Sequence, residues 1–170
     1  MTDLRPLYRK MVEEGDNFQG LSILSSRDEL GALIRANRIE TVLDFGSGRG
    51  NAYQPPHEIH KEWGITAPVL YDPAFATHDV LPAAGVKFDL VICSDVLEHV
   101  PQEHVHEFVA DLFDRSKRVL WASVCCRLAK KSFPDGSNLH VTVQPISWWR
   151  AVFAKHAKGR AISWFLRETR

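Results

Sequence analysis

The stretch Thr41–Gly50, TVLDFGSGRG, points to the fold because it joins a strand to a glycine-rich turn. Residues 41–45 are mostly apolar or β-branched, which is typical of a short buried strand. Gly46, Gly48 and Gly50 follow at every second position. Glycine lets a backbone turn sharply and approach a ligand without a Cβ clash. The GxGxG spacing differs from the GxGxxG of dinucleotide binders, so this stretch alone does not identify a ligand.

On both sides of this strand, apolar runs and helical stripes alternate along the chain. Further strands are predicted at 68–71, 88–94, 118–125 and 161–166, and residues 140–143 are expected to be short and extended. Helices are predicted over residues 4–14, from Ser26 or Asp28 to about 37, after Pro101, and over about 147–157. This alternation predicts an α/β fold with a doubly wound, mostly parallel sheet and helices on both faces.

Two features predict that the sheet is trimmed at one edge. Pro55 and Pro56 interrupt the helix expected after the glycine loop, so any helix there begins near His57. Only 15 residues separate Asp72 from the strand that begins at Phe88. That interval is too short for the usual helix and strand, and we expect a loop in their place.

Length and composition favour one soluble structural domain. Residues 1–38 are expected to form an N-terminal helical cap or flap, and residues 39–170 the compact body. No apolar run approaches the roughly 18 residues that a membrane span needs, and the N-terminus lacks a signal-peptide core. The three cysteines, Cys93, Cys125 and Cys126, do not suggest a disulfide framework. We therefore expect a cytoplasmic protein without a membrane partner.

Polar residues follow three of the predicted strands. Asp44 ends the first, Asp72 ends the second, and Ser94 and Asp95 end the third. In an open parallel sheet, ligands bind beyond the carboxyl ends of the strands, so these groups are expected to converge. A carboxylate such as Asp72 at the second strand end can accept hydrogen bonds from both hydroxyls of a ribose.

Asp44–Gly50, Asp72 and the segment FDLVICSDVLEHV (88–100) together resemble the class I S-adenosylmethionine-dependent methyltransferases. The resemblance covers roughly residues 40–125 and implies a Rossmann-like fold. FQGLS (18–22) and NLHVTVQPISWW (138–149) are similar to small methyltransferases of bacteria and phages whose substrate is undefined.

The resemblance implies a role for ten residues in binding S-adenosylmethionine. Gly46, Ser47 and Gly48 would lie under the methionine part, with Asp44 near its amino group. The remaining positions are the ribose ligand Asp72, Pro73 beside the adenine, Asp79 and Val80 at the adenine edge, and Ser94 and Asp95 over the sulfonium end. Carboxylates suit this cofactor because it carries a sulfonium cation.

Asp95, Glu98 and His99 form the pattern D-x-x-E-H, which on a helical turn places all three side chains on one face. With His140 from a later loop they can hold a divalent metal ion with open positions. Glu98, His99 and His140 are also the candidates for a catalytic general base. The alternative is that Glu98 and His99 only cap and pack.

The acceptor is expected to be an oxygen or nitrogen atom of a small molecule or sugar. Residues 1–114 carry 9 Lys and Arg against 19 Asp and Glu, whereas residues 115–170 carry 12 against 2. This asymmetry indicates either attraction within one fold or a basic face for a nucleic acid. RNA methylation therefore stays open, as does a relative that binds the cofactor or a partner protein without catalysis.

Overall fold

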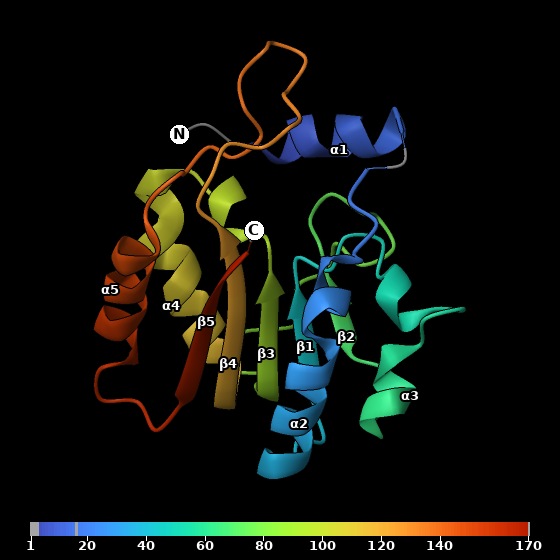
Figure 1. Cartoon of the computed structure of the whole chain (residues 1–170), viewed down its shortest axis with the longest axis vertical. Helices are drawn as coiled ribbons and strands as arrows, with labels where there is room; N and C mark the ends of the chain where they lie inside the picture. Colours follow the sequence, from blue (N-terminus) through green and yellow to red (C-terminus); the bar gives the residue numbers. More distant parts are fainter. Residues whose placement is uncertain (1–3, 16, 170) are drawn as a thin grey trace.

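A five-stranded parallel sheet forms the centre of the computed structural model, which describes residues 4–15 and 17–169 (Figure 1). Residues 1–3 and 16 of the expected N-terminal cap lie outside the described residues. The strands are β1 Val42–Phe45, β2 Val69–Tyr71, β3 Phe88–Ser94, β4 Ser116–Cys125 and β5 Ser163–Thr169, in the order β2-β1-β3-β4-β5. The chain order reverses at β1, so the carboxyl edge beside β1 is where a ligand site is expected.

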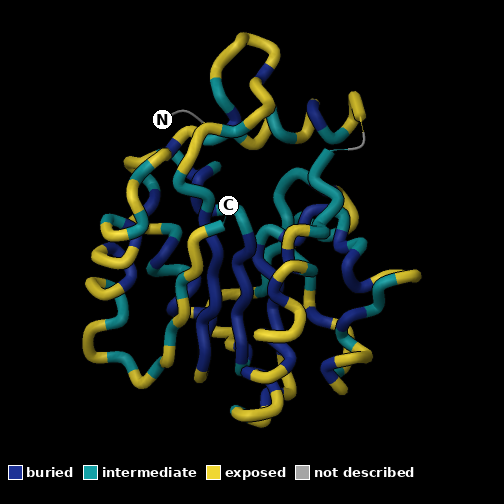
Figure 2. The backbone as a smooth tube through the Cα atoms, in the orientation of Figure 1, coloured by how far each residue is buried: buried dark blue, intermediate teal, exposed yellow. Residues whose placement is uncertain are grey.

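Helices cover both faces of the sheet, which confirms the Rossmann-like α/β fold. α4 Val105–Arg115 and α5 Ile146–Ala157 pack on one face, and α2 Arg27–Asn37 and α3 Ile59–Trp63 pack on the other. Alternate residues of β1, β3 and β4 serve the two cores: Leu43 faces α4 and α5, whereas Val42 faces α2 and α3. Figure 2 shows β1, β3 and β4 as the buried centre, whereas the edge strands β2 and β5 are partly exposed.

The trimmed edge is confirmed. Residues 72–87, between β2 and β3, contain neither helix nor strand, and β2 is the outermost strand. After the glycine loop the chain forms only a 3₁₀ turn, Asn51–Tyr53, before the short α3 begins at Ile59. The two prolines in between account for this interruption.

Most element boundaries agree with the sequence within one or two residues, but β5 extends three residues beyond its apolar run. Its last residues are polar and gain partners from other elements. Arg167 pairs with Glu29 of α2 at 3.2 Å, and the Thr169 hydroxyl donates to Asp95 at 2.9 Å. Residues 140–143 form no strand.

A third, smaller hydrophobic cluster lies beyond the carboxyl edge of the sheet. It joins α1 Arg5–Glu13, through Met11, to the loop after β4, through Phe133 and Leu139. We call α1 together with residues 126–140 the roof. Figure 1 shows α1 and this loop across the strand ends. Among the described residues, no helix combines the length and the apolar character needed to cross a membrane.

Candidate functional site

A cavity of about 790 Å³ opens at the carboxyl edge of the sheet, under the roof. The ends of three strands contribute to its lining, in the order Phe45 and Gly46, Tyr71 and Asp72, and Ser94 and Asp95. Six of the ten predicted cofactor residues line it: Gly46, Gly48, Asp72, Pro73, Ser94 and Asp95. The convergence of strand ends expected from the sequence is therefore present.

The glycine loop of β1 interlocks with the segment before α2. The Arg49 amide donates to the Phe18 carbonyl at 2.9 Å, and the Asn51 amide donates to the Gln19 carbonyl at 3.2 Å. A Cβ on Gly48, whose φ is +57°, would overlap the Phe18 carbonyl oxygen. These contacts hold the glycine loop against residues 18–20.

The Asp72 carboxylate is fixed at the cavity wall by two backbone amides. Gly48 donates to Oδ2 and Ala74 donates to Oδ1, each at 2.9 Å. Burial raises the pKa of Asp72, and these two hydrogen bonds oppose the rise. Each carboxylate oxygen has a second lone pair, so Asp72 can still accept hydrogen bonds from a ligand.

Asp44, at the end of β1, and Ser47, within the glycine loop, are buried and do not line the cavity. Tyr53 donates its hydroxyl to Asp44 Oδ2 at 2.8 Å. Burial raises the pKa of Asp44 to about 7, the Tyr53 hydrogen bond opposes this rise, and the Asp72 charge adds to it. Asp44 thus supports the floor of the cavity from below.

Asp79 and Val80 do not line the cavity. The Asp79 carboxylate pairs with Arg9 of α1 at 3.0 Å, and Val80 is 81% exposed. Arg9 also donates to the Pro73 carbonyl at 2.8 Å, so it ties the roof to residues 72–87. The roles implied for Asp79 and Val80 stay predictions.

Ser94 and Asp95 close the end of β3. The Ser94 hydroxyl lies 3.2 Å from those of Ser22 and Ser123. Asp95 has φ +54°, so it cannot begin a regular helical turn. Its Oδ1 accepts from the hydroxyls of Ser123 and Thr169, at 3.0 and 2.9 Å.

The structure brings three of the four predicted metal ligands together. Side-chain ligand atoms of Glu98, His99 and His140 all lie within 4.8 Å of one another, and Asp95 is not in that group. Glu98 and His99 belong to the 3₁₀ turn that follows β3, whereas His140 comes from the roof. The group therefore spans the boundary between roof and sheet.

Glu98 is fully buried with only one of its oxygens satisfied. Oε1 accepts from the Cys125 amide at 3.0 Å, and Oε2 finds no hydrogen-bond partner among the described residues. Burial raises the pKa of Glu98 to about 8, and the Asp95 charge contributes. A buried carboxylate oxygen without a partner is costly, and a cation beside it removes that cost.

The two histidines are oriented by backbone carbonyls. His99 Nδ1 lies 3.0 Å from the Leu139 carbonyl oxygen, and His140 Nδ1 is hydrogen-bonded to the Arg127 carbonyl. A carbonyl only accepts, so each Nδ1 carries the hydrogen and each Nε2 of a neutral ring keeps its lone pair. Burial and the neighbouring His140 lower the pKa of His99 to about 4, so this ring is neutral at pH 7.

Sequence patterns do not reveal several of the residues that line the cavity. Tyr8 lines it, donates its hydroxyl to the Leu139 carbonyl at 3.1 Å and lies 3.1 Å from His99 Nδ1. Leu81, Phe108 and Asp111 also line it. The apolar stripes of the two helices, which contain Tyr8 and Phe108, indicate burial, but no pattern shows which side chains border a cavity.

Comparison with protein-family models identifies a family. A family model described as a methyltransferase domain matches residues 17–162, which is most of the chain. The matched range includes the glycine loop, Asp72, the group Glu98–His99–His140 and residues 126–140 of the roof. No curated protein and no solved structure is significantly similar to the chain.

Proposed function

The chain belongs to the methyltransferase-domain family, and we propose that it transfers the methyl group of S-adenosylmethionine to an oxygen or nitrogen atom of a small molecule or sugar. One observation carries this proposal. Three strand ends meet in one cavity that combines a glycine floor, a fixed carboxylate at Asp72 and apolar walls. Such a combination suits a ligand with a sugar, a flat base and a cationic end.

The residues that line the cavity define the proposed binding mode. Asp72 accepts from the ribose hydroxyls, and the methionine part lies over Gly46 and Gly48. Ser94 and Asp95 face the sulfonium end. Asp44, Ser47, Asp79 and Val80 have supporting roles in this proposal, since none of the four lines the cavity.

The proposed reaction requires little covalent chemistry from the protein. The cofactor supplies an electrophilic methyl group, and the acceptor displaces it in line. The protein contributes alignment of the two reactants and exclusion of water. The proposed catalytic residues are Glu98, His99 and His140. His99 lines the cavity and can orient an acceptor and take up its proton, whereas Glu98 and His140 do not line it and would act by supporting His99.

We also propose that Glu98, His99 and His140 hold a divalent metal ion. Two imidazole nitrogens and one carboxylate oxygen are a donor set that first-row divalent ions accept. The unpartnered Glu98 Oε2 and the two Nδ1–carbonyl contacts fit such an ion. An ion there would supply Lewis-acid chemistry, and Asp95 would lie outside its ligands.

Metal titration tests this site. The wild type is expected to bind one equivalent of Mn²⁺ or Zn²⁺, and dialysis against a chelator is expected to abolish methyl transfer until metal is restored. His140→Ala is expected to lose the ion, whereas His156→Ala, which changes an α5 histidine paired with His106, is expected to keep it. Unchanged activity after chelation, or equal metal content in both variants, would contradict the proposal.

Nucleic acid is the second candidate acceptor, and the ion pairs weigh against it. Four basic residues of the C-terminal part pair with acids of the N-terminal part. The pairs are Arg115 with Asp111, Lys117 with Asp89, Arg160 with Asp114 and Arg167 with Glu29. These pairs offset part of the charge asymmetry within the fold, since they involve four of the 12 Lys and Arg of residues 115–170.

A transfer assay with labelled S-adenosylmethionine tests the function. The panel contains hydroxyl- and amine-bearing small molecules, sugars and short RNAs. Labelling of a small acceptor with little dependence on salt is the expected result. Labelling of RNA alone, with affinity that falls steeply as salt rises, would favour the nucleic-acid alternative. Cofactor binding without transfer to any member would favour a non-catalytic relative.

A further inference from the structure

The wall of the cavity next to Asp72 has little structure of its own. Residues 72–87 replace the missing edge of the sheet with turns, and Val80 and Val86 are exposed by 81% and 45%. Leu81, within this segment, lines the cavity and packs against the core that α4 covers. Residues 72–78 are held by hydrogen bonds among themselves and by the contact of His78 Nε2 with the Gly48 carbonyl, whereas the part that contains Leu81 is held by contacts from outside the segment.

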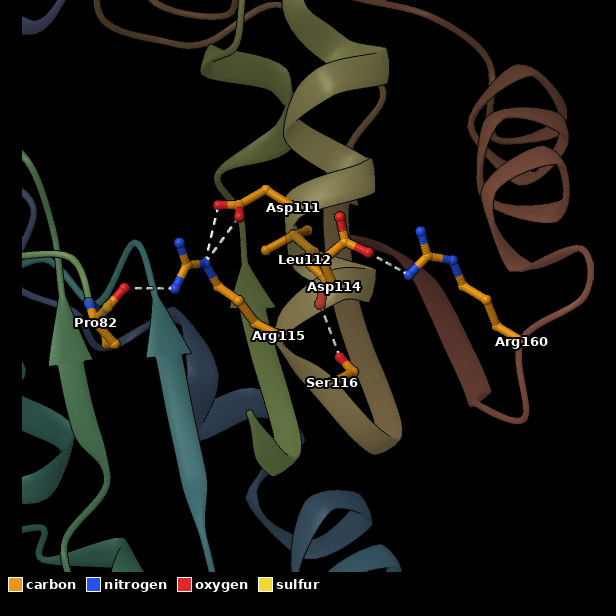
Figure 3. A network of polar contacts seen from close by, with 7 residues as sticks. All are labelled: Pro82, Asp111, Leu112, Asp114, Arg115, Ser116 and Arg160. Carbon is orange, nitrogen blue, oxygen red and sulfur yellow. Dashed lines mark hydrogen bonds and ion pairs between the residues drawn. The ribbon is translucent and has the colours of Figure 1, made fainter. Parts of the chain in front are cut away.

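Arg115, in the last turn of α4, makes that connection. Its Nη1 donates to the Pro82 carbonyl at 2.8 Å, and its Nε lies 3.0 Å from both oxygens of Asp111 (Figure 3). Arg115 is buried, with only 7% of its surface exposed. A buried guanidinium whose donors meet a carboxylate and a carbonyl fixes both groups in a defined geometry.

The two groups that Arg115 holds flank residues of the cavity lining. Asp111 lines the cavity itself, about one turn of α4 after Phe108, and Pro82 directly follows Leu81. Arg115 does not line the cavity. It therefore acts on the cavity only through the positions of Leu81 and Asp111.

We propose that Arg115 is a positioning residue for the nucleoside end of the cofactor. This inference rests on the proposed function, in which Asp72 holds the ribose. The base then lies beyond Asp72, against the apolar side chains of Leu81 and Phe108, with the Asp111 carboxylate as an acceptor for its amino group. Without Arg115, residues 79–83 lose their anchor on α4 and this compartment loses its shape.

Calorimetry with two ligands tests the inference. S-adenosylhomocysteine contains both halves of the cofactor, whereas 5′-methylthioadenosine lacks the amino-acid half. Arg115→Met is expected to weaken the binding of both ligands by the same factor, roughly tenfold, since a displaced Asp111 loses its hydrogen bond to the base and the loss of one charged hydrogen bond has about that effect. Arg160→Met is the matched control, because Arg160 pairs with Asp114 of the same helix on its outer side (Figure 3).

The outcomes separate this inference from the proposed function. If the wild type binds neither ligand, the proposed cofactor site is wrong. If the wild type binds both and Arg115→Met binds them equally well, or loses affinity for S-adenosylhomocysteine alone, the role of Arg115 is overturned. Should Arg115→Met fail to fold, Arg115→Lys serves instead: it keeps a charge for Asp111 but cannot span both partners, and it is expected to lose several-fold affinity for both ligands. Wild-type affinity in Arg115→Lys would equally overturn the inference.

Discussion

At the scale of single residues, burial raises the pKa of acidic side chains at the site toward neutral pH. Asp44 has lost nearly all contact with water, and its carboxylate accepts a hydrogen bond from the Tyr53 hydroxyl. Its pKa of about 7 lies well above the usual 3.8. Between these two values the folded protein holds a proton that the unfolded chain has released. Stability therefore falls as the pH rises from about 4 to about 7.

Asp44→Asn removes this titration and isolates its effect. The free energy of unfolding of the variant, relative to wild type, is expected to rise by on the order of 2 kcal/mol between pH 5 and pH 8. Urea unfolding at both pH values measures this difference. Asp114→Asn, an exposed change on α4, is expected to show no such trend. A difference for Asp44→Asn that stays constant with pH would show that Asp44 titrates normally.

At the scale of elements, the glycine loop is part of an interlocked pair of turns. Gly20 and Gly48 both have positive φ, and each lies against a carbonyl of the other segment. A side chain at Gly48 meets two obstacles, the left-handed backbone and the Phe18 carbonyl oxygen. Gly159 has φ +78°, but no atom lies within 4 Å of the place that a Cβ would occupy, so only the first obstacle applies there.

This contrast gives a matched pair of variants. Gly159→Ala is expected to cost about 1–2 kcal/mol, the penalty of the left-handed conformation. Gly48→Ala is expected to cost roughly 2–5 kcal/mol, because overpacking against backbone adds to that penalty. Thermal or urea unfolding of both variants compares them. Equal costs would mean that the two turns do not interlock as described.

The sequence predicts elements better than contacts between them, for a physical reason. Apolar periodicity marks the strands and helices because burial selects it directly, and the bounds predicted for β3 agree with those in the structure. The contacts within the roof are not marked by such periodicity. Its small core joins Met11 to Phe133 and Leu139, which lie more than 100 positions later in the chain. No local sequence pattern predicts such a pairing.

The site residues likewise divide into those that the sequence predicts and those that it does not. A local pattern reveals Asp72 and the glycines because both belong to ligand-binding strand ends. The sequence also indicates Glu98, His99 and His140, and the structure places them together. The prediction that Asp95 shares their helical face is wrong, because its left-handed backbone turns it toward Ser123 and Thr169. Arg115 has no sequence signal at all, since its role depends on a loop that replaces a missing edge.

At the scale of the whole molecule, two sets of contacts compensate for the uneven charge of the chain and for the lost edge of the sheet. Some of the opposite charges of its two parts meet in ion pairs, within α4, between α4 and the loop after α5, and between β5 and α2. The lost edge of the sheet is replaced by residues 72–87, anchored to α4 by Arg115 and to α1 by Arg9. The ion pairs and the anchored residues 72–87 both leave the carboxyl edge beside β1 open for the cavity.

The proposed function depends above all on whether this cavity binds the cofactor through Asp72. Calorimetric titration of S-adenosylhomocysteine into wild type, Asp72→Asn and Asp114→Asn answers that question. We expect wild type and Asp114→Asn to bind with equal affinity, and Asp72→Asn to bind roughly tenfold to a hundredfold more weakly, as expected for hydrogen bonds to a charged group. Equal affinity of Asp72→Asn and wild type, with both folded, would contradict this binding mode.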